Sequence, residues 1–302
     1  MNPYFTSSIF MVRPASFGVN PETSGTNAFQ SKILMDKADV IQQKAESEFD
    51  TMVDKIRKHG VNVKVFQDTK DEVRPDAIFP NNWISTHPNG PTVIYPMLAP
   101  NRRLEVREDV VDYVMTSEKI DLTSFAEKEV FLEGTGCMVI DHQKGIIYVA
   151  RSQRVDEELV EKVAEKLNFS ICRFLATDHQ NNPIYHTNVA MFVTHTHVGI
   201  ALETIANEKE RAEVVRAIEN SGKKVLELSY YQITQFSGNM IQLQNKSGKL
   251  VLIASRSGWS ALDEKQKREL EKESEIVTVD IPTIEMYGGG SARCMIAEVF
   301  RS

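Results

Sequence analysis

The run that ends in Cys294 is the first place in this sequence where chemistry could occur. Gly288, Gly289 and Gly290 lie just before it, and glycine permits backbone conformations and close ligand approaches that a side chain prevents. Arg293 directly precedes the cysteine, and a nearby cation favours the thiolate, the nucleophilic form of a thiol. Cys294 is therefore a candidate nucleophile. The alternative is a glycine turn that leads into a buried strand, because an unpaired cysteine often serves as a small apolar residue.

Two further titratable residues could complete such a site. Glu133 lies just before a glycine-containing turn, and His186 lies just before a Thr-Asn pair. A cationic imidazole would stabilise the thiolate and move protons, and a carboxylate would hold the imidazole in one tautomer. Taken singly, His186 could be structural and Glu133 could be a solvated loop charge. Their common place on a sequence repeat is what favours catalysis.

Five short segments form that repeat. They share small or turn-forming residues, then one polar or thiol residue, then apolar residues suited to a strand. The polar or thiol positions are spaced by 55, 51, 51 and 55 residues and are Asn82, Cys137, Asn188, Asn239 and Cys294. A period of ~50 residues is typical of repeated supersecondary units, and units repeated around an axis would bring these segments together at the centre. Chance similarity between short turns is the alternative.

Helical and strand-like segments alternate between these positions. Apolar spacing predicts helices over residues 27–59, 101–117, 155–167, 207–221 and 260–273. Runs rich in β-branched residues predict strands over residues 61–66, 146–149, 171–174, 198–201, 225–228, 250–254 and 276–279. Ser260, with Asp263 three residues later, gives the last helix a loose capping box. We therefore expect an α/β protein of five similar units in a single catalytic domain over residues 1–302.

Composition narrows the class of partner. The 302 residues carry a net charge of −7 without a dense Lys/Arg block, which argues against nucleic acid or an anionic membrane as the main partner. No apolar run approaches the ~20 residues of a membrane span, and residues 1–11 do not resemble a signal peptide. Cys137, Cys172 and Cys294 cannot all pair and fit no zinc motif. We expect a cytoplasmic protein with a free thiol, a small-molecule substrate, and no metal or other cofactor.

The cysteine run, residues 288–295, resembles the C-terminal cysteine loop of the guanidino-group-modifying superfamily, the penteins. This superfamily includes arginine deiminases, amidinotransferases and dimethylarginine dimethylaminohydrolases. Residues 132–134 resemble its acidic-glycine motif, and residues 186–188 resemble its catalytic histidine motif. The resemblance implies a five-bladed α/β propeller, which agrees with the repeat. It also implies that Cys294, His186 and Glu133 are the catalytic residues.

The resemblance is closest to the citrulline-utilisation hydrolase branch, through residues 11–14, 79–83 and the cysteine loop. Residues 99–105 resemble an arginine-containing stretch of the dimethylarginine enzymes, and residues 150–154 resemble a segment whose last arginine binds the substrate α-carboxylate. Arg103 and Arg154 are therefore expected to form a carboxylate clamp, with surface ion pairs as the alternative for each. The expected substrate-binding set is completed by Asn82, Asn188, Asn81 and Phe79.

Three departures from the superfamily bear on the substrate. Arginine deiminases have an Asp where this chain has Asn82, and another where it has Asn188. A guanidinium offers only donors and suits carboxylates, whereas a neutral ureido group has a carbonyl acceptor and N–H donors, which an amide can match. The two amides thus favour citrulline over arginine, unless they only shape turns. Gly136 stands where many relatives have an Asp, so the contact to the substrate α-amino group is open.

The favoured hypothesis is a hydrolase that converts citrulline to ornithine, ammonia and carbon dioxide through a covalent adduct on Cys294. The alternative enzyme is an amidinotransferase or a deiminase with an arginine-like substrate. A non-enzymatic alternative is a ribosome-binding or ligand-binding pentein, but the ribosome-binding members lack the Cys–His pair that is present here. The sequence leaves open whether the protein forms a homodimer and which C–N bond breaks first.

Overall fold

The computed structural model describes residues 2–31, 35–116 and 118–300. Its strands are β1 (Ser8–Arg13), β2 (Asn62–Gln67), β3 (Ile84–Ser85), β4 (Thr92–Ile94), β5 (Lys119–Asp121), β6 (Met138–Asp141), β7 (Ile146–Ala150), β8 (Ser170–Phe174), β9 (Met191–Val193), β10 (His197–Ile200), β11 (Lys224–Glu227), β12 (Ile241–Gln244), β13 (Leu250–Ser255), β14 (Glu275–Val279) and β15 (Ala297–Glu298). Its α-helices are α1 (Ala38–Lys58), α2 (Pro100–Arg103), α3 (Glu108–Val114), α4 (Gly134–Cys137), α5 (Glu157–Leu167), α6 (Thr187–Ala190), α7 (Glu208–Asn220), α8 (Tyr230–Thr234), α9 (Arg256–Ala261), α10 (Glu264–Glu271) and α11 (Pro282–Gly288). Short 3-10 helices are η1 (Pro80–Asn82), η2 (Thr123–Lys128) and η3 (Leu202–Thr204).

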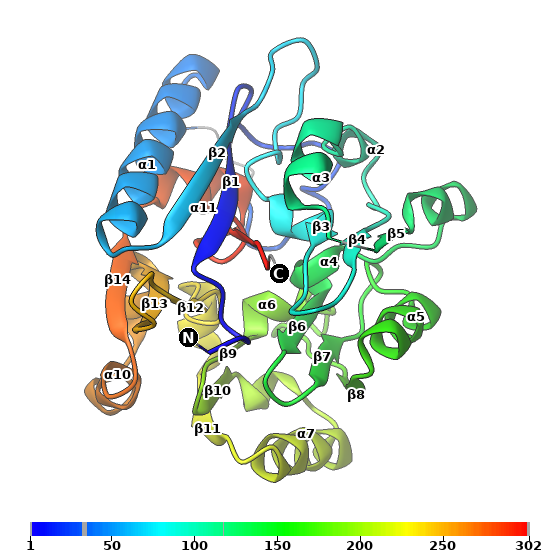
Figure 1. Ribbon diagram of the computed structural model, residues 1–302, viewed down its shortest axis with the longest axis vertical. Helices are drawn as coiled ribbons and strands as arrows, with labels where there is room; N and C mark the ends of the chain where they lie inside the picture. Colours follow the sequence, from blue (N-terminus) through cyan, green and yellow to red (C-terminus); the bar gives the residue numbers. More distant parts are fainter. Residues whose placement is uncertain (1, 32–34, 117, 301–302) are drawn as a thin grey trace.

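The described strands form five three-stranded sheets with one plan. They are β15-β1-β2, β3-β4-β5, β6-β7-β8, β9-β10-β11 and β12-β13-β14. In each sheet the middle strand pairs antiparallel with one neighbour and parallel with the other. Parallel neighbours need a crossover, and α1, α3, α5, α7 and α10 provide it at the periphery of the molecule (Figure 1). This is the expected five-bladed α/β propeller.

The repeat positions lie where each blade begins near the axis. Asn82 precedes β3, Cys137 precedes β6, Asn188 precedes β9, Asn239 precedes β12 and Cys294 precedes β15. Figure 1 shows α4, α6 and the last segment of the chain close to the centre of the ring. A direct bond joins two of these turns, because Nδ2 of Asn239 donates to the carbonyl of Asn188 at 2.9 Å. Residues that recur at a regular interval in the sequence therefore lie close together at the centre of the ring.

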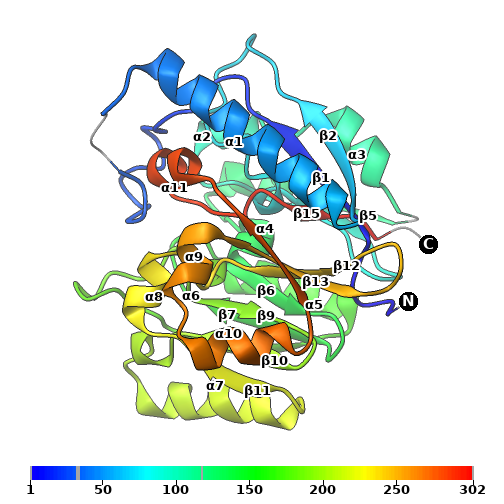
Figure 2. The ribbon, with the colours of Figure 1, turned by 90° about the vertical axis from the view of Figure 1, so that its left-hand side faces the viewer.

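The last strand closes the ring. β15 pairs antiparallel with β1, with Ile9 opposite Glu298, so one sheet combines strands from both ends of the chain. Both ends of the described chain consequently lie on one side of the molecule, while α8 and α11 lie toward the other side (Figure 2). Among the described residues, no helix is long and apolar enough to cross a bilayer.

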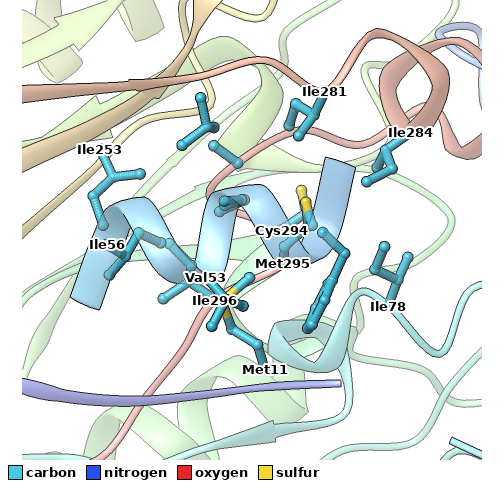
Figure 3. Packing of buried hydrophobic residues seen from close by; sticks show 14 of the residues in the cluster. Met11, Val53, Ile56, Ile78, Ile253, Ile281, Ile284, Cys294, Met295 and Ile296 are labelled. Atoms are coloured by element: carbon cyan, nitrogen blue, oxygen red, sulfur yellow. The ribbon is translucent and has the colours of Figure 1, made fainter. Parts of the chain in front are cut away.

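Close packing surrounds the cysteine that precedes β15. The buried face of α1 includes Ile41, Phe49 and Ile56, which recur at the spacing of an amphipathic helix. These residues belong to one apolar cluster that also contains Cys294 and Met295. Figure 3 shows both side chains beside α1, among other apolar residues of the cluster. Because protein interiors are packed as densely as organic crystals, this contact restricts the position of Cys294.

The strand predictions are confirmed to within about one residue at each end. The predicted strand over 146–149 is β7, and the one over 171–174 is β8. The helix prediction over 27–59 is wrong in its first part, because α1 begins at Ala38. Before it, Nδ2 of Asn27 donates to the carbonyl of Gly288 at 3.3 Å, and Nε2 of Gln30 donates to that of Tyr287 at 2.7 Å. Such side-chain bonds compete with helix formation; the expected helical residues Ile33 and Leu34 lie outside the described residues.

Two other predicted helices are each divided. The helix over 101–117 is replaced by α2 and α3, because the backbone is extended at Arg107 before α3 begins; residue 117 lies outside the described residues. The helix over 260–273 is replaced by α9 and α10, with an extended backbone at Leu262. The capping box is formed by Asp263 with Gln266, and not by Ser260 with Asp263. The helices over 155–167 and 207–221 are confirmed as α5 and α7.

Candidate active site

The glycine run fixes Cys294 through close packing. A β-carbon at Gly288 would lie 2.7 Å from the ring of Phe79, and one at Gly290 would lie 2.9 Å from the same ring. Between them, Gly289 has a positive φ of 64°, which L side chains rarely adopt. The chain can therefore turn from α11 toward β15 beneath Phe79 only with glycine at these positions. The turn presents Cys294, which is 5% exposed, to a small and partly open cavity.

The sulfur of Cys294 lies between two amides. Nδ2 of Asn239 donates to Sγ at 3.2 Å, and Nδ2 of Asn188 lies 3.6 Å from the same atom. The backbone N–H of Cys294 donates to Oδ1 of Asn239 at 3.3 Å. Two blades therefore supply N–H groups to one sulfur atom.

Glu133 and His186 form a buried pair. Nε2 of His186 lies 2.7 Å from Oε2 of Glu133, and Nη1 of Arg154 donates to the same oxygen at 2.9 Å. Burial alone would raise the pKa of Glu133, but the charge of Arg154 and the hydrogen bond from His186 outweigh burial and hold that pKa well below its usual range. Burial lowers the pKa of His186 to about 4, despite the neighbouring carboxylate. His186 is thus neutral at pH 7, which differs from the expected imidazolium.

This protonation state assigns a task to each nitrogen of His186. Glu133 is ionised and can only accept a hydrogen bond, so Nε2 of His186 carries the proton that it donates. Nδ1 then has a free lone pair, and His186 lines the same cavity as Cys294. An unprotonated nitrogen in that position is suited to take a proton from a thiol.

Asn82 faces the cavity with a fixed orientation. Its Oδ1 accepts a hydrogen bond from Nη1 of Arg102 at 2.8 Å, and Glu105 holds Arg102 with two carboxylate oxygens at 2.8 and 2.9 Å. A guanidinium can only donate, so the amide oxygen must point to Arg102 and the amide nitrogen must point away. Nδ2 of Asn82 is buried and has no partner. This small cavity, of about 20 Å³, therefore presents a donor that requires an acceptor.

Two more buried groups in the cavity wall have unused hydrogen-bonding capacity. Oδ1 of Asp76 and Nε of Arg154 have no hydrogen-bond partner. The carboxylate oxygen of Asp76 can accept from an ammonium group. The guanidinium nitrogen of Arg154 can donate to a carboxylate. Among residues 2–31, 35–116 and 118–300, no group of three or more His, Cys, Asp or Glu side chains could hold a metal ion.

The family follows from sequence comparison. Residues 13–301 match the model of the family described as N,N dimethylarginine dimethylhydrolase, eukaryotic. The chain belongs to this family. As a member of the dimethylarginine dimethylhydrolase family, it is a hydrolase of the guanidino-modifying superfamily that acts on C–N bonds. No curated protein sequence matches it.

Solved structures of other proteins share the fold of this member of the dimethylarginine dimethylhydrolase family. The fold is similar to that of ArgZ, an arginine dihydrolase from the ornithine-ammonia cycle in cyanobacteria, with a TM-score of 0.76 and 13% identity. That match covers 98% of this chain and 41% of ArgZ, so the chain spans about two fifths of that relative. The N-terminal domain of ArgZ bound to product matches over 97% of both chains, with a TM-score of 0.74 and 14% identity. A dimethylarginine dimethylaminohydrolase adduct with S-methyl-L-thiocitrulline matches over 97% of this chain and 99% of that one, with a TM-score of 0.64 and 12% identity.

The structure brings most of the expected residues to one cavity. The residues of its wall include Cys294, His186, Phe79, Asn82 and Arg154. Glu133 does not line the cavity but contacts His186, and Asn188 approaches the sulfur. Asn81 is buried beside the cavity but does not line it, and neither polar atom of its side chain has a partner.

Arg103 is not in the cavity wall. Its guanidinium donates to the carbonyls of Met97 at 3.0 Å and Leu98 at 3.1 Å, and its side chain is exposed. Consecutive residues of a helix point in different directions, and on α2 it is Arg102 that points inward. The expected clamp of Arg103 with Arg154 is therefore not assembled in this structure.

Three residues at the site were missed in the sequence. Asn239 occupies a repeat position, which was the signal that could have identified it, but only Asn82, Asn188 and Cys294 among these positions were given a role. Arg102 stands beside Arg103, and the sequence does not tell which of two adjacent arginines faces inward. Asp76 lies three residues before Phe79 without a recognisable motif.

Gly136 explains why this chain lacks the Asp of many relatives. A β-carbon at Gly136 would lie 2.3 Å from Nδ2 of Asn82 and 2.9 Å from Nδ1 of His186. No side chain fits there without displacing one of these groups. Asp76, with its free oxygen, is the carboxylate that this cavity offers instead.

We expect Arg154→Gln to lower the free energy of unfolding by about 3–5 kcal/mol at pH 7, because it leaves the buried Glu133 carboxylate without its counter-charge. In the native protein the depressed pKa of Glu133 contributes stability above its ordinary value of 4.5, and this contribution is lost as the pH falls. In the variant, burial raises the pKa of Glu133 without the opposing charge of Arg154. Protonation of Glu133 in acid then removes the unfavourable buried charge. The stability gap should therefore narrow between pH 7 and pH 4 in urea denaturation.

The matched control is Arg103→Gln, which removes an exposed guanidinium from α2 and should cost about 0.5 kcal/mol or less at both pH values. An Arg154→Gln variant whose stability gap is independent of pH would contradict the ion-pair interpretation.

Proposed function

We propose that this chain hydrolyses the ureido group of citrulline, giving ornithine, ammonia and carbon dioxide. The observation that supports citrulline is the locked amide of Asn82. Because Arg102 occupies its oxygen, Asn82 offers the cavity an N–H donor. A ureido carbonyl can accept from that donor, whereas a guanidinium has five donors and no acceptor.

In the proposed reaction, Nδ1 of His186 takes the proton of Cys294, and the sulfur electron pair forms a bond to the ureido carbon. Asn82 donates to the carbonyl oxygen as negative charge develops on it. One C–N bond then breaks, and the departing amine takes the proton from His186. Water, deprotonated by the same imidazole, attacks the adduct, and the C–S bond breaks with its electron pair returning to sulfur. The carbamic acid released in this step then breaks its remaining C–N bond, giving carbon dioxide and the second amine. Glu133 keeps the imidazole oriented throughout.

The amino-acid end of the substrate would be held by Arg154 and Asp76. We propose that Nε of Arg154 binds the α-carboxylate and that Oδ1 of Asp76 binds the α-ammonium group, since each is buried in the cavity wall without a partner. The guanidinium of Arg102 already bonds Glu105 and Asn82. Its charge would therefore attract the substrate carboxylate mainly without a hydrogen bond to it.

A guanidino substrate is the second candidate. The family is named for a dimethylarginine, and ArgZ is described as an arginine dihydrolase. The free oxygen of Asp76 is the observation in its favour, because a carboxylate is a good acceptor for a guanidinium. Mass spectrometry of the products after separate incubation with citrulline, arginine and dimethylarginine distinguishes the two. Ornithine from citrulline alone supports our proposal, and turnover of the guanidino substrates alone overturns it.

Asn82→Asp combined with Asn188→Asp should change which ligand binds. Two added carboxylates can accept hydrogen bonds from a guanidinium, which has only donors. A ureido carbonyl, by contrast, loses the N–H donor of Asn82. Each charge-assisted hydrogen bond contributes about 1.5–3 kcal/mol, so the ratio of citrulline affinity to arginine affinity should fall at least about tenfold. Calorimetry in the Cys294→Ser background measures binding without turnover. Asn89→Asp, at an exposed position, is the control; an unchanged ratio in the double variant would remove the physical basis for citrulline.

A further inference from the structure

The polar environment of the Cys294 sulfur is made of neutral groups. The amide of Asn239 approaches Sγ at 3.2 Å, closer than that of Asn188 at 3.6 Å. Asn239 is 1% exposed, and it lies on the turn before β12, in a different blade from Glu133 and His186. Burial of an amide is unfavourable unless its polar atoms form hydrogen bonds. The hydrogen bonds of Asn239 therefore indicate what this buried amide does beside the nucleophile.

The orientation of Asn239 is fixed by three bonds. Its Oδ1 accepts from the backbone N–H of Cys294 at 3.3 Å, and a backbone N–H can only donate. Nδ2 must therefore be on the other side, where it donates to the carbonyl of Asn188 at 2.9 Å and to Sγ at 3.2 Å. The sulfur accepts this bond from Asn239, and an accepting sulfur is the form that a thiolate takes. In the thiol form it can donate to Oδ1 of Asn188, which lies farther away at 3.9 Å.

The cations near the cavity are engaged elsewhere. Arg154 pairs with Glu133, Arg102 pairs with Glu105, and His186 is neutral while donating to Glu133. None of these bonds ends on sulfur. Stabilisation of a sulfur anion before substrate binds must therefore come largely from amide donors.

The remaining groups around Cys294 do not supply a positive charge either. Tyr185 donates its hydroxyl to the carbonyl of Gly289 at 2.8 Å. The guanidinium of Arg293 turns away to the carbonyl of Ile296 at 2.8 Å, and it approaches Glu298 at 3.5 Å. Asp76, which also lines the cavity, is anionic. Arg293, which the sequence suggested as the activating cation, thus has another task.

We propose that Asn239 is a catalytic residue that stabilises the thiolate of Cys294. It acts twice in the reaction: when the proton leaves sulfur for His186, and when the C–S bond of the adduct breaks and its electron pair returns to sulfur. Asn188 assists from the opposite side. This inference rests on the proposed role of Cys294 as nucleophile, but it does not depend on which substrate the chain hydrolyses.

The test is the pH dependence of alkylation by iodoacetamide, a neutral probe, in the substrate-free protein. Asn239→Leu preserves the shape of the side chain and removes the donor, and Asn239→Asp replaces the donor by a like charge. A hydrogen bond to a charged group is worth enough to move such an equilibrium by about one to two pH units. We expect the midpoint of the pH–rate curve for Cys294 to rise by that amount in the Leu variant and further in the Asp variant. The thiolate absorbance in the ultraviolet should move with it.

Ser237→Ala is the matched control. Ser237 is buried in the same turn, and its hydroxyl donates to the carbonyl of Gly258 at 2.7 Å rather than to sulfur. This variant should perturb the turn and leave the midpoint unchanged. An unchanged midpoint in folded Asn239→Leu, or an equal shift in Ser237→Ala, would overturn the proposal. If wild-type protein does not hydrolyse citrulline, the proposed substrate fails, while the alkylation result still decides the role of Asn239.

Discussion

Cys294→Ser removes turnover entirely and leaves the fold intact. A serine hydroxyl has nearly the shape of the thiol, so packing against α1 and the two amides is kept. It is far harder to ionise, however, and the neutral His186 is too weak a base to make an alkoxide available. Product analysis should show no turnover, and circular dichroism and thermal unfolding should match the parent protein.

Cys172→Ser provides the comparison. Burial raises the pKa of Cys172 to about 11 and raises that of Cys137 still further, so neither thiol is a competent nucleophile at neutral pH. Cys172 lies in β8, on the outer part of its blade, and its replacement should preserve activity. Full activity in Cys294→Ser would refute the covalent mechanism.

Gly136→Ala should abolish activity with only a modest loss of stability. The added methyl group would lie 2.3 Å from Nδ2 of Asn82 and 2.9 Å from Nδ1 of His186, so at least one of them must move. Displacement of a reacting group by about 1 Å costs on the order of 100-fold in rate, whereas overpacking costs about 1–3 kcal/mol of stability. We expect kcat/KM to fall by at least about 100-fold.

Gly18→Ala is the control for that substitution, since a β-carbon at Gly18 meets no atom within 4 Å. It should change neither kcat/KM nor the melting temperature appreciably. Wild-type turnover in Gly136→Ala would mean that Asn82 and His186 do not act together on the substrate.

The strands and the blade repeat could be read from the sequence because they depend on local apolar pattern. β7 and β8 are short β-branched runs, and their burial in a blade follows directly from that composition. The repeat positions were predictable for the same reason, since each marks the turn before a strand. Convergence on an axis then placed Cys294, Asn188 and Asn239 in contact.

The features that the sequence did not predict depend on contacts between distant segments. Residues 27–31 have apolar spacing that suits a helix, yet Asn27 and Gln30 bind the carbonyls of Gly288 and Tyr287 instead. The inward position of Arg102 depends on Glu105 and Asn82, of which Asn82 belongs to another element. The neutral state of His186 depends on its burial, which no local pattern reveals.

The pairing of β15 with β1 also bears on when the site assembles during folding. A nascent chain emerges from its N-terminus, so Glu133 and His186 leave the ribosome before Cys294 does. The thiol can reach Asn239 only when the last strand has docked against a partner made almost a whole chain length earlier. Contacts with such large sequence separation form slowly, so we expect the contact between Cys294 and Asn239 to form late in folding.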